Sequence, residues 1–385
     1  MNSDPIQVLH VLGRLNRGGA ELRTLELMKN MDRMRYKFHV CCLSGLPGEL
    51  DGEVRSLGGE VHLLPLGISF PAKFRRLLRD GHFGAVHSHV HWPSGYIVRL
   101  AAQEEIPQRI CHFASTWDGK REGLARRLRN RLLKEFVERY ATDIVGVSEG
   151  ALAANFGPGW PQDPRCRVIY RGIEVERFRE APDRAGMRAE FDLPPDAFVV
   201  LHVGRMDPPK NHERLVRIFE RFLRLTPNAY LLLVGAVREP IASRVRQMAD
   251  QAGVSDRIRY AGIRSDLPRL LKSSDLMIFP SLWEGLPGSV LEAVAAQLPV
   301  LATDLPGIRE IAQYLPGLLT MSLDLSDDLW AEAALDLQSR TGICTPDILL
   351  GSPFSMERSV AASDELYCSG GLRQQATSTA VECRV

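Results

Sequence analysis

The sequence lacks long hydrophobic runs and lacks an excess of charge of one sign. Its 385 residues carry 48 basic and 47 acidic side chains, a formal net charge of +1. Nucleic-acid-binding domains are usually strongly basic, so we expect no nucleic-acid partner. No window approaches the roughly 20 apolar residues of a membrane-spanning helix, and the opening MNSDPIQVLHVLG does not read as a signal peptide. We therefore expect a cytoplasmic protein.

Cysteine is present, but it is not arranged for a disulfide framework or a metal finger. The seven cysteines are scattered without a Cys-x-x-Cys spacing, which predicts reduced thiols in an intracellular protein. The sequence also has no internal repeat and no low-complexity block. With 45% apolar and 25% charged residues, the composition is that of a globular protein.

What the sequence does contain is two series of short apolar segments separated by helical patterns. Seven segments precede residue 172 and six follow it: IQVLHVLG, KFHVCCL, EVHLLPL, GAVHSHV, QRICHFA, DIVGVS and CRVIY, then FVVLHVGR, AYLLLVG, RIRYAG, DLMIFPS, LPVLATD and GLLTM. Apolar strands that alternate with helices are typical of parallel sheets covered on both faces. Together with the chain length, the two series predict an α/β protein of two doubly wound domains.

We expect the two domains at residues 1–180 and 195–340. Residues 174–197 are charged, contain prolines and show no strand pattern, which favours a linker. Residues 341–385 are expected to contain one further helix, in FSMERSVAASDELY, followed by a loose tail.

Ligands of such sheets bind beyond the carboxyl ends of the strands, so the loops that follow strands are where chemistry is expected. In GRLNRGGAELRTLELM, Gly18 and Gly19 precede an amphipathic helix whose first N–H groups could face an anion. In VGRMDPPKN, Arg205 and Lys210 lie on a loop stiffened by two prolines and would suit a diphosphate. The alternatives are a plain tight turn and a solvated basic turn.

The stretch SLWEGLPGSVLEA, residues 281–293, places two carboxylates around a glycine-rich turn. Glu284 stands in the loop after an expected strand, and Glu292 lies about one turn inside the next helix. Gly285 and Gly288 let a ligand approach the backbone, and the helix N-terminus favours phosphate oxygens. Because a carboxylate does not stabilise a phosphate, the glutamates should accept hydrogen bonds from hydroxyl groups. A diphosphate with hydroxyls at both ends describes a nucleotide-diphosphate sugar.

The E-x7-E spacing of Glu284 and Glu292, with a lysine five residues after Arg205, resembles family 4 of the retaining glycosyltransferases. The likeness runs through GGAE, HSHVHWPSGY, VSEG, VIYRGIEVERF and EGLPGSVLEAVAAQLPVLATDLPGIREI. It implies a GT-B fold: two Rossmann-like domains facing a cleft, the N-terminal one for the acceptor and the C-terminal one for the sugar nucleotide. It also implies that helices within residues 341–385 return to the N-terminal domain.

The resemblance implies roles for four side chains of the C-terminal domain. Arg205 and Lys210 would hold the diphosphate, Glu284 would meet the transferred sugar, and Glu292 would accept hydrogen bonds from the ribose. Negative charge builds on the diphosphate as the glycosidic bond lengthens, and the two cations would stabilise it most in the transition state. No cofactor or metal is expected, and the Asp-x-Asp manganese motif of the other glycosyltransferase fold does not occur. Same-face attack with retention is the implied mechanism.

Further contacts are implied from both domains. His112 would lie near the transferred sugar, although a strand histidine is otherwise often a satisfied core residue. Gly18 and Gly19 would cap the diphosphate from the opposite domain. The backbone donors to sugar and phosphate would come from Gly285, Leu286, Pro287, Gly288 and Ser289.

Two positions depart from the family pattern. Gln297 stands where a glycine is usual before LPV, which would alter a helix C-cap at a cost of about 1 kcal/mol or less. Arg171 replaces the commoner asparagine before GI. If Arg171 lies near the cleft, it would change the recognition of base or phosphate.

Three histidines, His87, His89 and His91, alternate in VHSHVHW, which would place them on one face of a strand. Three imidazoles on one face could bind zinc. No carboxylate or cysteine is spaced with them, and the family has histidines here without metal. We therefore predict a wall of the acceptor pocket and no metal site.

Residues 119–143 combine apolar side chains at helical spacing with an excess of basic ones. In one account the apolar face packs on the sheet and the basic face is solvated. In the other, residues 119–140 and the segment KFRRLLR, Lys73–Arg79, dock on anionic lipid. The two accounts are compatible. The second would place the protein on the inner face of the membrane and would suit a lipid-linked acceptor.

These observations favour a retaining glycosyltransferase that moves a sugar from a nucleotide-diphosphate sugar to a saccharide or lipid-linked acceptor in polysaccharide or glycoconjugate biosynthesis. A nucleotide-sugar epimerase would share the fold, and a non-catalytic scaffold is a further alternative. An NAD-dependent oxidoreductase would also use two such domains. Against it, GRLNRGG is not G-x-G-x-x-G, and KFHVCCLSG does not end in an acidic residue for a ribose.

Overall fold

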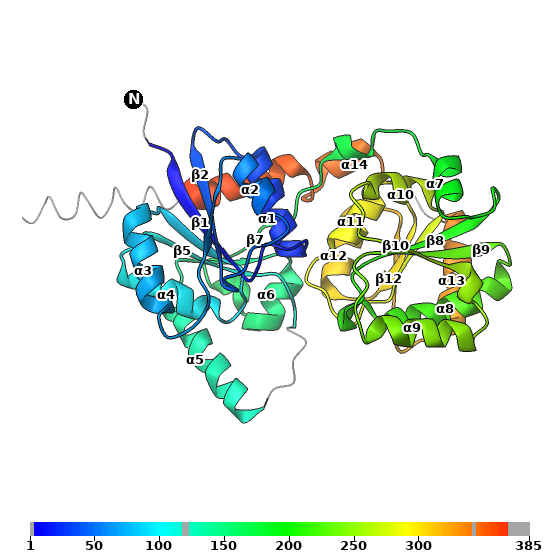
Figure 1. Cartoon of the computed structure of the whole chain (residues 1–385), viewed down its shortest axis with the longest axis horizontal. Helices are drawn as coiled ribbons and strands as arrows, with labels where there is room; N and C mark the ends of the chain where they lie inside the picture. Colours follow the sequence, from blue (N-terminus) through cyan, green and yellow to red (C-terminus); the bar gives the residue numbers. More distant parts are fainter. Residues whose placement is uncertain (1–3, 118–122, 341–343, 369–385) are drawn as a thin grey trace, which may run out of the picture. The chain divides into compact units, whose positions relative to one another are not determined.

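The computed structural model of the chain describes residues 4–117, 123–340 and 344–368. Within these residues the chain divides into two compact units (Figure 1). The first unit contains residues 4–116, 123–171 and 356–368, and the second contains residues 117, 172–340 and 344–355.

The first unit is built on a parallel sheet of seven strands in the order β3-β2-β1-β4-β5-β6-β7. The order reverses direction between β1 and β4, which is the topological switch point of a doubly wound sheet. The strands are β1 (Ile6–Leu12), β2 (Tyr36–Cys42), β3 (Glu60–Leu63), β4 (Ala85–Ser88), β5 (Gln108–Phe113), β6 (Asp143–Gly146) and β7 (Cys166–Val168).

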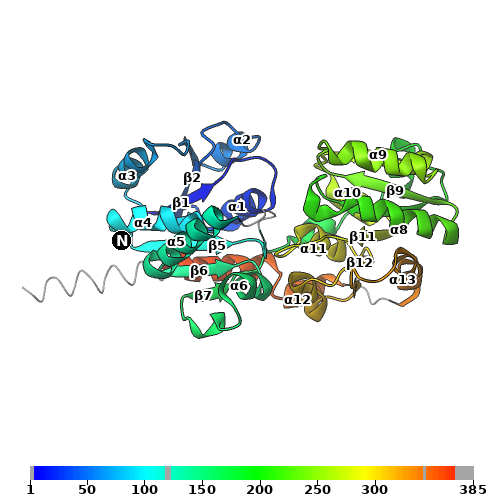
Figure 2. The same ribbon diagram turned by 90° about the horizontal axis from the view of Figure 1, so that it is seen from below.

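Helices cover both faces of this sheet (Figures 1 and 2). They are α1 (Gly19–Asn30), α2 (Asp51–Ser56), α3 (Phe70–Gly81), α4 (Ser94–Gln103), α5 (Leu124–Tyr140), α6 (Glu149–Phe156), the 3-10 turn η1 (Trp160–Gln162) and a helix over residues 356–368.

Alternate residues of β1 enter two different cores. Val8 and Leu12 pack with the side of the sheet covered by α1 and the helix 356–368. Leu9 and Val11 pack with the side covered by α3 and α4. This is the period-two alternation of a strand buried on both faces. His10 therefore points to the same side as Val8 and Leu12, toward the helix 356–368.

The second unit repeats the plan with six parallel strands in the order β10-β9-β8-β11-β12-β13. Here the order reverses between β8 and β11, so the loops after these two strands flank the switch point. The strands are β8 (Phe198–Val203), β9 (Ala229–Val234), β10 (Ile258–Gly262), β11 (Leu276–Phe279), β12 (Val300–Thr303) and β13 (Leu318–Met321).

The helices of the second unit also lie on both faces of its sheet (Figure 2). They are η2 (Val175–Phe178), α7 (Arg184–Glu190), η3 (Pro208–Lys210), α8 (His212–Leu225), α9 (Ile241–Gln251), η4 (Ser255–Arg257), α10 (Leu267–Ser273), α11 (Gly288–Ala295), α12 (Pro306–Tyr314), α13 (Asp327–Arg340) and α14 (Pro346–Gly351).

The sheets confirm the fold class predicted from the sequence. Each of the seven apolar segments before residue 172 and each of the six after it contains a strand of the parallel sheets. The apolar runs were sufficient because parallel strands buried on both faces have no polar face to break the run.

The segment 174–197 is not a free linker. Residues 172–197 belong to the second unit, and α7 is anchored there by buried charge. Arg188 is only 5% exposed and donates to a carboxylate oxygen of Asp275 at 3.3 Å and to the carbonyl of Ala197 at 2.7 Å. The segment 174–197 has the charged composition of a linker but is ordered, because charged side chains such as Arg188 form hydrogen bonds with the rest of the second unit.

The helix 356–368 belongs to the first unit, although the chain reaches it only after crossing the second. Asp364 accepts hydrogen bonds from Arg35 at 2.8 Å and from the hydroxyl of Tyr36 at 2.8 Å. Ser359 donates to the carbonyl of Tyr170 at 2.9 Å. These contacts attach the helix 356–368 to the start of β2, to the residue before it and to the segment after β7. The expected tail, residues 369–385, lies outside the described residues.

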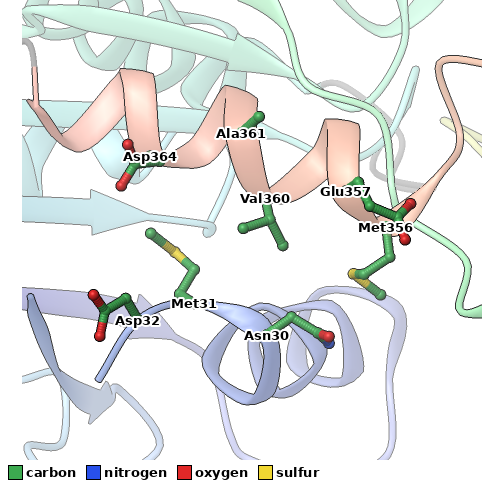
Figure 3. A pocket seen from close by; sticks show the side chains of 8 residues that line it. All are labelled: Asn30, Met31, Asp32, Met356, Glu357, Val360, Ala361 and Asp364. Atoms are coloured by element: carbon green, nitrogen blue, oxygen red, sulfur yellow. The ribbon is translucent and has the colours of Figure 1, made fainter. Parts of the chain in front are cut away.

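A cavity of about 500 Å³ lies where this helix passes the end of α1 (Figure 3). It is lined by Asn30, Met31, Asp32, Met356, Glu357, Val360, Ala361 and Asp364. Its apolar lining residues are the two methionines, Val360 and Ala361, and the candidate catalytic side chains discussed below do not line it. We treat it as a gap in the helix packing.

Gln297 ends α11 in the left-handed conformation, with φ of 64°. Its N–H bonds the carbonyl of Val294, and the N–H of Leu298 bonds the carbonyl of Ala293. This pattern is a Schellman motif, whose left-handed position is normally a glycine. A side chain at that left-handed position is unfavourable by roughly 1 kcal/mol relative to glycine.

Candidate active site

The candidate residues of the second unit gather at the switch point of its sheet. Arg205 and Lys210 lie in the loop between β8 and α8, and Glu284 lies in the loop between β11 and α11. The two loops are joined by hydrogen bonds: Asn211 donates to the carbonyl of Pro280 at 3.0 Å, and the N–H of Leu282 donates to Pro209 at 2.7 Å. The loops therefore form one connected rim at the carboxyl ends of neighbouring strands.

The shortest contact across this rim joins Lys210 to Glu284. The ammonium Nζ lies 2.6 Å from Oε1 of the carboxylate, and the two side chains are 19% and 14% exposed. The same ammonium lies 4.7 Å from the centre of the Phe279 ring, at the end of β11. This cation–π contact helps to hold the ammonium at the rim. The sequence predicted Lys210 and Glu284 separately, and the structure brings them together.

The side chain of Arg205 forms an ion pair with Asp207 in its own loop. Its Nε lies 2.9 Å from Asp207, and Arg238 contacts the same carboxylate at 3.1 Å. Arg205 remains 46% exposed. A diphosphate would have to compete with Asp207 for this guanidinium, a competition that the sequence did not show.

Glu292 is the fifth residue of α11, as the sequence predicted, and is 7% exposed. Its Oε1 lies 3.6 Å from Arg177, which belongs to η2. Reasoning from the sequence missed Arg177, because nothing in VIYRGIEVERF marks it apart from the other charged residues. The two glutamates thus each face a cation within the second unit.

Gly307, which the sequence analysis did not identify, lies against the glycine-rich loop after β11. It is the second residue of α12, and a Cβ built on it would lie 1.8 Å from the carbonyl oxygen of Gly285. The backbone of α12 therefore touches the backbone of the loop that carries the predicted donor contacts. A glycine after proline in LPGI, directly beyond a strand, was the available signal.

In the first unit, Gly18 and Gly19 stand where α1 begins. Gly18 is the N-cap with an extended backbone, and α1 starts at Gly19. Neither glycine has a positive φ, and a Cβ at Gly19 would meet no atom within 4 Å, so Gly19 is not required by a close contact or a left-handed turn. That geometry leaves open space beside the helix N-terminus, as an anion-binding loop needs.

The other feature of this switch point is a cluster of buried imidazoles. His10 on β1 pairs in register with His87 on β4, and the rings of His87 and His112 are stacked with centres 5.1 Å apart. His112 is 3% exposed. Its Nδ1 lies 2.9 Å from His87 and its Nε2 lies 3.1 Å from Arg23. Both ring nitrogens of the predicted catalytic histidine are thus already hydrogen-bonded.

Burial sets the charge of these rings. It lowers the pKa of His10 to about 3, and it holds the pKa of His87, His89 and His112 well below 6.5, with neighbouring rings and Arg23 adding to the effect. All four imidazoles are therefore neutral near pH 7.

His91 does not join His87 and His89 on one face. β4 ends at Ser88, and His91 adopts φ of 57°, so the strand alternation stops before it. Its ring packs edge-on against Trp92 and Phe113. The histidine that lies beside His87 and His89 is instead His10: one ring nitrogen of each of these three residues lies within 4.8 Å of the others. The placement expected from HSHVH is therefore wrong, because the strand is shorter than the motif.

Arg171, the unusual residue before GI, forms an ion pair within the first unit. Its guanidinium donates to both carboxylate oxygens of Glu26 on α1, at 2.9 and 2.6 Å. The two side chains are 12% and 17% exposed. A bidentate pair of this kind is strong and geometrically specific.

α5 differs from the account in which its apolar face packs on the sheet. Leu124, Leu128 and Leu132 are 78%, 69% and 49% exposed, while Val137 near the other end is buried. The first turns of α5 extend beyond the sheet (Figure 1). The part of the predicted surface at residues 118–122 lies outside the described residues. For its first half, α5 therefore presents an uncovered apolar stripe.

The second basic segment, Lys73–Arg79, forms ion pairs with a neighbouring carboxylate. Arg79 of α3 lies 3.1 Å from Glu104, and Arg75 contacts the same carboxylate. Two of the four cations of KFRRLLR are therefore neutralised at the end of α4. Among the described residues, no helix is long and apolar enough to cross a membrane.

Two parallel α/β sheets, each with its candidate residues at the switch point, define the GT-B class of glycosyltransferases. The fold is similar to that of HepE from Anabaena, whose crystal structure with UDP and glucose has a TM-score of 0.78 and 17% sequence identity. The similarity covers 94% of this chain and 100% of that one.

Sequence comparison identifies the family. Residues 18–172 match a glycosyl transferase 4-like domain, and residues 183–321 match glycosyl transferases group 1. CapH, a capsular polysaccharide biosynthesis glycosyltransferase of Staphylococcus aureus, is 32% identical over 342 residues, 87% of this chain and 91% of CapH. An Escherichia coli UDP-Gal:α-D-GlcNAc-diphosphoundecaprenol α-1,3-galactosyltransferase is 25% identical over 60% of each chain. The chain belongs to the group 1 glycosyltransferases.

Proposed function

We propose that the protein transfers a sugar, with retention of configuration and without a metal ion, from a nucleotide-diphosphate sugar to a saccharide or lipid-linked acceptor in polysaccharide or glycoconjugate assembly. The Lys210–Glu284 pair at the β8/β11 switch point carries this proposal. It sets an ammonium and a carboxylate 2.6 Å apart, where a doubly wound sheet binds its ligand. An anionic leaving group would pair with the ammonium of Lys210, and the hydroxyl groups of a sugar would donate hydrogen bonds to the carboxylate of Glu284.

The proposed chemistry follows from the placement of charge. Lys210 and Arg205 would bind the diphosphate and stabilise the negative charge that develops on it as the glycosidic bond breaks. Glu284, released from Lys210, would accept hydrogen bonds from the sugar hydroxyls. Glu292 would accept from the ribose, and the backbone from Gly285 to Ser289 would donate to sugar and phosphate. The leaving phosphate would accept the proton of the attacking hydroxyl.

Relatives and neighbours support the donor class. HepE has been crystallised with UDP and with UDP-glucose, and CapH is named for capsular polysaccharide biosynthesis. The Escherichia coli relative is named for transfer from UDP-Gal to a diphosphoundecaprenol-linked sugar. We propose a donor of the same chemical class and leave its base to experiment.

A thermal-shift screen tests the donor. The purified protein is heated with UDP-, GDP- and ADP-sugars, with their diphosphates, and with NAD and NADP, with and without EDTA. We expect one nucleotide-sugar set to raise the melting temperature equally in both conditions, because selective binding stabilises the folded state by about 2.7 kcal/mol at 100 times Kd. A shift lost in EDTA would contradict metal independence. Stabilisation by NAD alone would favour an oxidoreductase, and no shift with any ligand would favour a scaffold.

The exposed face of α5 supports a membrane-bound acceptor. Between Leu124 and Tyr140 there are six basic and two acidic residues, and the apolar stripe of Leu124, Leu128 and Leu132 is uncovered. A basic helix with an exposed apolar face is suited to the surface of an anionic bilayer. We propose that α5 docks on anionic lipid and brings the enzyme to a lipid-linked acceptor.

Reversing the charge of Arg126, Arg127 and Arg129 to glutamate is expected to weaken binding to anionic vesicles by at least about 100-fold. Each basic residue near such a surface contributes about 1 kcal/mol. The measurement is co-sedimentation with vesicles of phosphatidylglycerol and phosphatidylcholine.

The matched control makes the same change of charge elsewhere. Arg224, Arg244 and Arg246 are exposed arginines of the second unit, with side chains 62%, 57% and 52% exposed. Their reversal should leave vesicle binding within a few-fold of wild type. Equal losses in both triple variants would reduce the effect to net charge, and unchanged binding in the α5 variant would refute the docking surface.

A further inference from the structure

A continuous line of hydrogen bonds runs through the buried rings of the first unit. It begins at the guanidinium of Arg23 on α1 and ends at His89, after β4. The donor–acceptor distances are 3.1 Å from Arg23 to His112, 2.9 Å from His112 to His87, 2.8 Å from His87 to Tyr367, 3.3 Å from Tyr367 to His10 and 2.9 Å from His10 to His89.

The chemistry of Arg23 gives this line one direction. A guanidinium only donates, so Nε2 of His112 must accept. A neutral imidazole has one N–H, and the proton of His112 is therefore on Nδ1, from which it is donated to Nε2 of His87. By the same rule, Nδ1–H of His87 donates to the hydroxyl of Tyr367.

The second half of the line follows in the same way. The Tyr367 hydroxyl, having accepted from His87, donates its own proton to Nε2 of His10. Nδ1–H of His10 then donates to Nε2 of His89. Three rings, His112, His87 and His10, thus carry the proton on Nδ1 and point it away from Arg23. Neutrality is essential, because a doubly protonated ring could not accept.

Tyr367 joins the two halves of this line of hydrogen bonds. It is 1% exposed and lies on the helix 356–368, and its hydroxyl connects the His112–His87 half to the His10–His89 half. Without that hydroxyl, Nδ1–H of His87 would lose its acceptor and Nε2 of His10 its donor, both in a buried site. An unsatisfied buried group of this kind costs about 1–3 kcal/mol, and the other tautomer of His87 would set its Nε2–H against the Nδ1–H of His112.

We infer that Tyr367 is a positioning residue for the transfer reaction: its hydroxyl accepts the Nδ1–H of His87 and so holds the ring against which His112, whose tautomer Arg23 sets, is oriented. The inference rests on the proposed function, in which His112 lies near the transferred sugar. With Nε2 held by Arg23 and Nδ1–H held by His87, the His112 ring presents one constant face and edge at the switch point of the sheet. It follows that His112 acts by shape and by holding Arg23, and that it does not shuttle a proton.

The test is Tyr367→Phe, which keeps the ring in its packing and removes the hydroxyl. In the wild-type protein, nitrogen-15 NMR of the imidazoles should show Nδ1–H tautomers for His10, His87 and His112 between pH 6 and 8. In the variant, the signals of His87 and His10 should change. We expect kcat to fall about tenfold or more, because a His87 ring that has lost its acceptor no longer holds His112 in one position, with the donor KM unchanged.

Tyr36→Phe is the matched control. The Tyr36 hydroxyl also anchors the helix 356–368, through Asp364 at 2.8 Å, but it lies outside the line of rings. Its loss should lower stability without changing the tautomers or kcat. A second variant, Arg23→Gln, replaces the obligate donor with an amide that can also accept. It should yield mixed tautomers along the line.

The outcomes separate the inference from the proposed function. Nε2–H tautomers in the wild type, or identical spectra for wild type and Tyr367→Phe, would overturn the chain even in an active enzyme. Altered tautomers with wild-type kcat would overturn the positioning role. If the wild type transferred no sugar from any donor, the proposed function would fail, and the positioning role with it. If Tyr367→Phe did not fold, the wild-type and Arg23→Gln spectra would decide.

Discussion

The double variant Arg205→Ala/Lys210→Ala is expected to lose transfer activity by about 10⁴-fold or more while remaining folded. Removing one preorganised group that stabilises developing charge typically costs about 100- to 1,000-fold in kcat, and two such groups act here on the same leaving group. Because the charge develops in the transition state, kcat should fall further than the donor KM rises. Steady-state kinetics of the single and double variants measures both.

Removing Lys210 is also expected to lower the stability of the protein, because Lys210 forms an ion pair with Glu284. Lys210→Ala removes the ammonium that lies 2.6 Å from the carboxylate of Glu284, whose side chain is 14% exposed. Losing a hydrogen bond to a charged group costs about 1.5–3 kcal/mol, so a lower melting temperature is expected. Lys210→Ala/Glu284→Gln should recover part of that stability but none of the activity, which separates the structural role of the pair from its catalytic role.

Arg224→Ala is the matched control. Arg224 also lies 2.6 Å from a carboxylate, that of Glu220, on the exposed side of α8. Its removal should leave transfer unchanged. Turnover retained in Arg205→Ala/Lys210→Ala would show that neither cation activates the leaving group and would remove the proposed mechanism.

Gly307→Ala is expected to reduce transfer by about 100-fold, although residue 307 offers a ligand no side chain. The new Cβ would lie 1.8 Å from the carbonyl oxygen of Gly285, and the contact is with backbone. Either α12 or the loop must move, and a displacement of about 1 Å in a positioning element can cost 100-fold in rate. Overpacking should also lower stability by about 1–3 kcal/mol.

The measurement for Gly307→Ala is the donor affinity by calorimetry, together with kcat and the melting temperature. Gly351→Ala is the control, since Gly351 ends α14 and a Cβ there meets no atom within 4 Å. That variant should bind and transfer like wild type. If Gly307→Ala did the same, the loop from Gly285 to Ser289 would not be held by α12, and its predicted donor contacts would lose their structural support.

The sequence predicted the strands better than it predicted the segments around them. An apolar run buried on both faces is a local signal, and the expected strands are present. The segment 174–197 was misjudged as a linker because Arg188 and Asp275, which pair at 3.3 Å, are 87 positions apart. The apolar stripe of α5 was ambiguous for a similar reason, since helical spacing shows that a stripe exists and not what covers it.

The candidate site was predicted in the same uneven way. Arg205, Lys210 and Glu284 were proposed because they lie in loops whose sequence is unusual, and Glu292 because it follows the last of these loops in α11. Their partners were missed: Arg177 beside Glu292, Asp207 beside Arg205. The expected placement of His87, His89 and His91 on one strand face was wrong at His91, because one residue with a positive φ ends the alternation on which that placement depended.

The sequence by itself determined the two-sheet α/β architecture, the family and the loops that carry the candidate site, since all of these depend on patterns within a few tens of residues. Tertiary structure alone decided which groups meet. Tyr367 and His10 are 357 positions apart, and Gly307 meets Gly285 because β12 and β11, the strands that precede them, pair side by side in the sheet. The protonation pattern of the histidines was likewise decided by contact, because a tautomer depends on the partner at each ring nitrogen and local sequence does not specify that partner.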